Sequence, residues 1–233
     1  MTLSPQDLHR ALNELGDLRF GEIDVDEAMH RIVRTTHTIF DVDGAGLMLT
    51  DEDQVLRNAA VSDDRLAHLE RLQIEHGEGP CISAFDDKNL VCAEDLAAEK
   101  RWPSFCPAAL EVGVKAVLAS PIPFNQAAIG VVAVLSEDSR PWTPEAELAL
   151  MAFTDLAAVM IASVMHGQQQ SGLVTQLQGA LDSRAVIEQA KGILAGRDRL
   201  TMRQAYEQLR AQARAERRRL QEVSADLVRQ TTG

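Results

Sequence analysis

Residues 181–194 read L-D-S-R-A-V-I-E-Q-A-K-G-I-L, and residues 205–214 read A-Y-E-Q-L-R-A-Q-A-R. In the first stretch Ile187, Ala190 and Leu194 recur at steps of three and four residues, the spacing of one face of an α-helix. The second stretch has the same spacing. Because each apolar face must be buried against another element, the two stretches predict neighbouring helices in one small helical module.

The helical pattern extends on both sides of these stretches. The first helix begins near Leu173, and Gly196 is expected to end it. Thr201 and Gln204 form a capping box that opens the second helix. The third helix has its apolar face at Leu220, Val223 and Leu227. Residues 173–233 are therefore predicted to be an all-α three-helix domain.

The preceding residues mix helix and strand signals. Residues 4–19 are predicted to be a helix with Leu8, Leu12 and Leu15 on one face, within an N-terminal helical segment 1–24. Helices are also expected from Asp24 to Ile39, over 63–73 and from Thr143 to Met165. Strands are expected at Leu47–Thr50, Gln54–Val61, Leu90–Ala93, Val114–Pro121 and Ile129–Leu135. Pro and Gly lie between the last two strands, which are therefore predicted to form an antiparallel pair. We expect an α+β domain over 25–166, with an antiparallel sheet flanked by helices. Residues 167–172, G-Q-Q-Q-S-G, are either a linker or a continuing helix.

Charge divides the chain at this boundary. Residues 171–233 hold 11 basic and 7 acidic residues, a net charge of +4, whereas the remainder has a net charge of −16. Such asymmetry indicates that the basic part contacts nucleic acid and that the acidic part is repelled by it.

Basic side chains follow the predicted helices away from their apolar faces. Arg184 and Lys191 are seven residues apart, so two helical turns bring them to nearly the same direction. Guanidinium groups bind phosphate through paired hydrogen bonds. The candidate nucleic-acid contacts are Arg184, Lys191, Arg210, Arg214, Arg218 and Arg219. Tyr206 lies in an apolar stripe, so we interpret it as a core residue and expect no base-stacking platform.

No motif of a hydrolase, a metalloprotease or a phosphate-binding loop occurs, so we expect neither catalysis nor a bound metal. Cys81 follows Pro80 at the expected start of a helix, where the backbone dipole could lower the pKa of the thiol and create a redox site. The alternative is a small buried side chain. Three cysteines without metal-ligand spacing, no apolar run of membrane length and no export signal favour the cytoplasm.

The stretches at 181–194 and 205–214 resemble the ANTAR domain, a bacterial three-helix module, over about 173–230. The resemblance implies binding of RNA stem-loops, prevention of transcription termination and action as a homodimer. It places basic contacts at Arg184, Lys191, Arg210 and Arg214. It also implies that Gly192 lets a backbone or the RNA come close.

Residues 25–166 resemble a GAF domain of the kind fused to ANTAR modules in actinobacteria. The resemblance rests on Gly77-Glu78-Gly79-Pro80-Cys81, on Asp95-Leu96 with Arg101-Trp102-Pro103, and on Gly113-Val114 with Ala116-Val117-Leu118. It implies a regulatory sensor, and the residues indicate no particular effector or cofactor.

Two other functions remain open from the sequence. The same basic row could enter the major groove of DNA. Alternatively, the basic helices could bind an acidic protein surface, including that of the first domain, without any nucleic acid.

Overall fold

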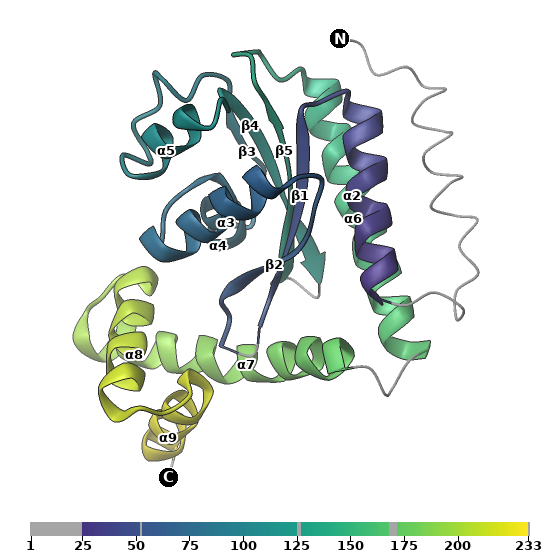
Figure 1. Ribbon diagram of the computed structural model, residues 1–233. Helices are drawn as coiled ribbons and strands as arrows, with labels where there is room; N and C mark the ends of the chain where they lie inside the picture. The colour runs from purple at the N-terminus through teal and green to yellow at the C-terminus, as the bar shows by residue number, and fades with distance from the viewer. Residues whose placement is uncertain (1–24, 52, 125–126, 168–171, 233) are drawn as a thin grey trace. The chain divides into compact units, whose positions relative to one another are not determined.

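The computed structural model describes residues 25–51, 53–124, 127–167 and 172–232 of the chain (Figure 1). The helix expected at 4–19 and residues 168–171 of the expected linker lie outside the described residues. Contacts within the chain divide it into two compact units, with the main boundary between Val174 and Thr175 and the short segment Thr50–Val55 grouped with the second unit. We describe each unit by itself.

The first unit is a five-stranded antiparallel sheet between two layers of helices. The strands have the order β2-β1-β5-β4-β3. Its elements are α2 (Val25–Phe40), β1 (Gly44–Thr50), β2 (Leu56–Val61), α3 (Asp64–His76), α4 (Pro80–Asp87), β3 (Val91–Ala93), α5 (Phe105–Glu111), β4 (Ala116–Phe124), β5 (Ala127–Ser136) and α6 (Pro144–Gly167). Helices α2 and α6 cover one face of the sheet, and α3, α4 and α5 cover the other (Figure 1).

The central strands explain why this sheet forms. Strands β4 and β5 pair along their length, from Ala116 opposite Ser136 to Phe124 opposite Ala127. Strand β1 pairs with the other edge of β5 and is buried at every residue. Position 130 of β5 requires glycine, because a Cβ atom there would collide with the carbonyl oxygen of Met48. Since helices cover both faces, the strands are apolar on both sides rather than alternating.

Local signals set the bounds of α3. The Asp63 carboxylate accepts hydrogen bonds from the backbone N–H groups of Arg65 (2.8 Å) and Leu66 (3.3 Å), which caps the start of the helix. Gly77, with φ of 66°, ends it in the left-handed conformation that glycine adopts without strain.

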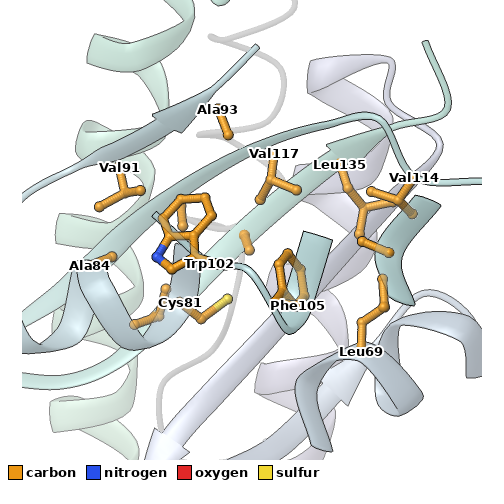
Figure 2. Packing of buried hydrophobic residues seen from close by; sticks show 14 of the residues in the cluster. Leu69, Cys81, Ala84, Val91, Ala93, Trp102, Phe105, Val114, Val117 and Leu135 are labelled. Carbon is orange, nitrogen blue, oxygen red and sulfur yellow. The ribbon is translucent and has the colours of Figure 1, made fainter. Parts of the chain in front are cut away.

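A hydrophobic core fills the space between the sheet and α3, α4 and α5 (Figure 2). Trp102 and Phe105 meet edge to face in it, with ring centroids 6.4 Å apart. The indole N–H of Trp102 donates to the hydroxyl of Ser83 (2.9 Å), so the ring is buried without losing its hydrogen bond. The Cys81 side chain points into the same cluster (Figure 2).

The second unit consists of three helices: α7 (Gly172–Asp198), α8 (Met202–Glu216) and α9 (Leu220–Thr232). Its core contains the apolar side chains that the spacing predicted on all three helices. They are Ile187, Ala190, Leu194, Ala205, Leu209, Ala213, Leu220 and Val223, with Leu227 packed against them. The predicted capping box is confirmed, because Thr201 and Gln204 exchange both hydrogen bonds. The fold class predicted for each part of the chain is therefore confirmed.

Three details of the prediction are wrong. Gly196 does not end α7, which continues to Asp198. A Cβ atom at residue 196 would meet nothing within 4 Å, so the packing does not require glycine there. Helix α5 was not expected. Strand β2 begins at Leu56 rather than at Gln54, because Gln54 occupies a turn with φ of 59°.

Candidate nucleic-acid interface

Two of the predicted basic residues meet at an aromatic ring. The Nζ atom of Lys191 on α7 lies 5.4 Å from the centroid of the Tyr206 ring on α8, and the guanidinium carbon of Arg210 lies 5.8 Å from it. Both distances are within the range of attraction between a cation and a π system. We call Lys191, Tyr206 and Arg210 the ring cluster.

The ring cluster is anchored in the helical core. Tyr206 is half-buried and packs against the buried side chains of the second unit, and its neighbour Ala205 is fully buried. Lys191 is also anchored, because its Nζ atom contacts a carboxylate oxygen of Glu188 at 2.7 Å and its side chain is 18% exposed. The ring and the ion pair therefore fix the position of the ammonium group, which reduces the conformational freedom it can lose on binding.

Arg210 and Arg214 extend the positive surface along α8. They are four residues apart, and Arg214 is exposed in the last turn. Within the described part of the chain, neither guanidinium forms an ion pair. Both can therefore bind an anion without first breaking a contact to a carboxylate.

Arg184 lies on α7 two helical turns before Lys191, but in a different environment. Its side chain is half-buried, and burial lowers the pKa of its guanidinium, an effect that the nearby Glu188 opposes. Gly192, next to Lys191, is exposed, and a Cβ atom there would meet nothing within 4 Å. Close approach of a backbone or of RNA to Gly192 therefore stays a prediction.

Arg218 does not join the ring cluster. It lies in the connection between α8 and α9 and contacts three carboxylates: Asp226 at 2.6 Å, Glu216 at 3.2 Å and Glu222 at 3.6 Å. These contacts raise the pKa of Arg218 and lower the pKa of Asp226, in both cases mainly through the hydrogen bond between the two side chains. The positive charge of Arg218 is therefore compensated within the second unit.

Arg219 is exposed and immediately precedes the first residue of α9. Its carbonyl oxygen accepts hydrogen bonds from the N–H groups of Glu222 (3.1 Å) and Val223 (3.2 Å). The αL conformation of Arg217, with φ of 53°, turns the chain from α8 into this helix. The predicted basic row thus separates into three parts: Arg210 and Arg214 on α8, which form no ion pair within the described part of the chain, Lys191 on α7, which pairs with Glu188, and the carboxylate-compensated Arg218 at the α8–α9 corner.

Tyr206 is the site residue that the sequence interpretation placed only in the core. It does pack against the core, but it also carries the two cations. Its spacing of four residues from Arg210 was the signal that could have revealed this, because side chains at that spacing meet on a helix.

The first unit contains a buried acidic side chain that the sequence interpretation also missed. Glu70 on α3 is 4% exposed, and Asn58 of β2 donates a hydrogen bond to its carboxyl group. Gly46 of β1 leaves room for the other carboxyl oxygen, which a Cβ atom would strike. Burial raises the pKa of Glu70 to about 8, against a smaller lowering by Asn58.

Cys81 is buried beside this group and is not activated. Its backbone N–H donates to the side-chain oxygen of Gln73 (2.8 Å). Burial, and next the negative charge of Glu70, raise the pKa of the Cys81 thiol to about 12. Of the two interpretations of Cys81, the structure agrees with the small buried side chain, because removal of the thiol from water outweighs any lowering of its pKa by the helix dipole. The structure therefore places Cys81 in the core and gives no support to a redox site there.

The described residues contain neither a group of side chains suited to a metal ion nor a helix suited to a membrane. No cluster of three or more histidine, cysteine, aspartate or glutamate side chains among them could hold a metal ion. None of the helices in the described ranges has the length and apolar character to cross a membrane.

Solved structures resemble the first unit. The GAF domain of a phosphoenolpyruvate-protein phosphotransferase from Acinetobacter has a TM-score of 0.56 and 15% identity, covering 72% of this chain and 99% of that one. A free methionine-R-sulfoxide reductase from Neisseria meningitidis, in complex with its substrate, has a TM-score of 0.55 and 15% identity, covering 71% and 96%. At these identities the likeness shows the fold alone. Among curated protein sequences, none matches the chain.

Family models define both parts of the chain. The GAF domain model matches residues 24–161, which is more than half of the sequence. The chain therefore belongs to the GAF family, in agreement with the sheet and the two helical layers of the first unit. The ANTAR domain model matches residues 175–228, the three helices of the second unit. The protein is thus a GAF–ANTAR regulator, as its sequence resemblance implied.

Proposed function

We propose that this GAF–ANTAR regulator binds RNA stem-loops and thereby prevents transcription termination, without catalysing a reaction. The ring cluster supports this proposal most directly, because it presents two anchored cations from two helices beside the open guanidinium of Arg214. Cations held in this way suit the closely spaced phosphates of a folded RNA. The GAF unit would control this binding in response to an effector of unknown chemistry.

Binding of labelled RNA hairpins to the full chain tests the proposal. We expect Lys191→Ala and Arg210→Ala each to weaken binding by about tenfold, as for the loss of one charged contact. The matched control is Arg229→Ala, which removes the same charge from α9, where Arg229 pairs with Asp226. Circular dichroism at the temperature of the assay would show that each variant remains helical.

The competing functions predict different outcomes. Equal or tighter binding to duplex DNA of the same length would favour a DNA-binding regulator. Absence of binding to every hairpin and duplex at low salt would favour a protein-interaction module. A loss that is equal for Arg210→Ala and Arg229→Ala would indicate attraction by net charge only, and it would remove the ring cluster from the proposal.

We further propose that the protein acts as a homodimer in the cytoplasm. The sequence resemblance supports the dimer, and the three cysteines, free in the structure, support a reducing compartment. Sedimentation of the full chain, with and without a bound hairpin, tests the dimer. Sedimentation as a monomer in both states would contradict it.

A further inference from the structure

Helix α8 is terminated by an arginine in a strained backbone conformation. Arg217 has φ of 53°, in the left-handed region that residues other than glycine rarely adopt. Its N–H group donates to the carbonyl oxygens of Ala213 and Arg214, so residue 217 closes the last turn of the helix. Glycine favours this position, and the GAF unit has glycine at the end of α3, where Gly77 has φ of 66°.

The arginine at residue 217 therefore costs the ANTAR unit stability. Backbone strain of this kind gathers at positions whose side chains have a function. A helix end offers one explanation without any ligand, because the helix dipole attracts a cation to the last turn. Arg199 after α7 and Lys88 after α4 have the same conformation, with φ of 56° and 55°. A cation at a helix end thus does not by itself distinguish Arg217 from these two residues.

The position of Arg217 along α8 does distinguish it. It lies seven residues after Arg210 and three after Arg214, so the three arginines follow the spacing of one side of the helix. The rise per residue puts residues 210 and 217 about 10 Å apart along the axis of α8. That length spans about three phosphate groups of one nucleic-acid strand. Arg217 therefore continues the basic surface to which Arg210 of the ring cluster belongs.

The carboxylates at the α8–α9 corner are occupied by the next arginine along the chain. Glu216, Glu222 and Asp226 all contact the guanidinium of Arg218. Arg217 is exposed and forms no ion pair with any residue that the structure describes. Its guanidinium can therefore bind an anion without losing a carboxylate contact, whereas that of Arg218 cannot.

We propose that Arg217 is an RNA-binding residue that contacts phosphate groups next to those bound by Arg210 and Arg214. This inference rests on the proposed function of the ANTAR unit. The left-handed backbone at residue 217 turns the chain into α9, and the same residue carries a guanidinium that the carboxylates of the corner leave uncompensated. Arginine occupies a position where glycine would make the fold more stable, because RNA binding requires its charge.

Arg217→Gly in the full chain tests the inference, because it removes the charge and relieves the backbone strain together. We expect the affinity for a labelled RNA hairpin to fall about tenfold, and the slope of log affinity against log salt to decrease by about one. The midpoint of thermal unfolding, followed by far-ultraviolet circular dichroism, should rise by a few degrees, because glycine adopts the left-handed conformation without strain. Arg217→Lys, which keeps a positive charge, should retain more of the affinity than Arg217→Gly.

Lys88→Gly is the matched control in the GAF unit. It removes the same charge and relieves the same backbone conformation, at the end of α4. We expect it to leave the affinity for the hairpin unchanged. Equal losses of affinity in Lys88→Gly and Arg217→Gly would overturn the inference, because net charge alone would explain both.

The remaining outcomes separate this inference from the proposed function. An unchanged affinity in Arg217→Gly would overturn the inference, and a loss for Arg210→Ala in the same assay would leave the proposed function intact. A fall of both the thermal midpoint and the affinity in Arg217→Gly would assign Arg217 to the stability of the helix end instead. Absence of hairpin binding by the unsubstituted chain would overturn the proposed function, and the inference with it.

Discussion

The two units of this protein place charged groups in opposite environments. In the GAF unit, the Glu70 carboxyl is 4% exposed, and Asn58, a neutral group, is its hydrogen-bond donor. In the ANTAR unit, Arg218 lies at the surface among three carboxylates. Burial therefore decides whether Glu70 is charged at all, whereas Arg218 stays charged and its neighbours decide whether the charge is available. This difference predicts that pH strongly changes the stability of the first unit. It also predicts that single arginine substitutions change RNA binding by the second unit to different extents.

The largest effect expected from this comparison is on the stability of the GAF unit. The pKa of Glu70 rises from 4.5 to about 8 on folding, so the folded state keeps a proton that the unfolded state releases. The contribution of Glu70 to the free energy of unfolding is thus greatest below about pH 4.5 and is lost between pH 4.5 and 8. At about 1.4 kcal/mol per pH unit, the total loss is on the order of several kcal/mol.

Denaturant unfolding at a series of pH values measures this loss. Both tryptophans of the chain, Trp102 and Trp142, lie in the GAF unit, so their fluorescence reports on that unit alone. The matched variant is Glu70→Gln, which keeps an oxygen that can accept from Asn58 but cannot ionise. We expect its stability to vary much less between pH 5 and 8. An unchanged pH dependence in Glu70→Gln would assign the effect to other groups.

The sequence predicted those parts of the fold that depend on residues close together in the chain, and it missed a part that depends on residues far apart. The core of the ANTAR unit follows from local spacing, so Ile187, Leu194 and Leu209 were placed correctly. Helix α5 was missed because its stability comes from elsewhere in the chain. The carboxylate of Glu78 accepts hydrogen bonds from the N–H groups of Ser104 and Phe105, at the start of α5.

The candidate site was predictable in part for the same reason. Arg210 and Arg214 follow from spacing along one helix, but the meeting of Lys191 with Tyr206 depends on the packing of α7 against α8. The compensation of Arg218 by Asp226 depends on the turn between α8 and α9. A buried Glu70 contradicts the usual exposure of glutamate, although its position between Leu69 and Gln73 on the inner face of α3 was a usable signal.

The next largest effect tests whether RNA affinity depends mainly on the guanidinium groups that form no ion pair with a carboxylate. Arg214→Ala removes an open guanidinium and should cost roughly 1–3 kcal/mol of binding free energy. It should also reduce the slope of log affinity against log salt by about one. Arg218→Ala should change the affinity less, because its guanidinium already contacts carboxylates. Hairpin titrations at several salt concentrations measure both variants. A larger loss for Arg218→Ala, with helicity retained, would reverse the assignment of open and compensated charge.

A smaller effect is expected for a neutral contact in the ANTAR unit. Thr201 caps α8 by accepting a hydrogen bond from the N–H group of Gln204 (3.2 Å). Thr201→Ala should lower the stability of this unit by about 1 kcal/mol. Thermal unfolding followed by far-ultraviolet circular dichroism measures the loss, and Thr201→Ser, which keeps the hydroxyl group, is the control. Little change in tryptophan fluorescence is expected, since both tryptophans lie in the GAF unit.

The smallest expected effect is a rise in RNA affinity rather than a loss. It distinguishes the pairing of arginines with particular carboxylates from the effect of net charge. Asp226→Asn removes the carboxylate shared by Arg218 and Arg229. Because this network is exposed and screened by solvent, its loss should barely change the thermal unfolding of the ANTAR unit. RNA affinity should nevertheless rise, because Arg229 loses its pairing with Asp226 and Arg218 keeps only two of its three carboxylate contacts. Asp198→Asn is the matched control, since it adds the same charge and frees only Arg197, on α7. An equal rise in RNA affinity in both variants would mean that net charge alone attracts the RNA. A larger rise for Asp226→Asn would support an RNA-binding surface whose affinity is reduced by the carboxylates of α8 and α9.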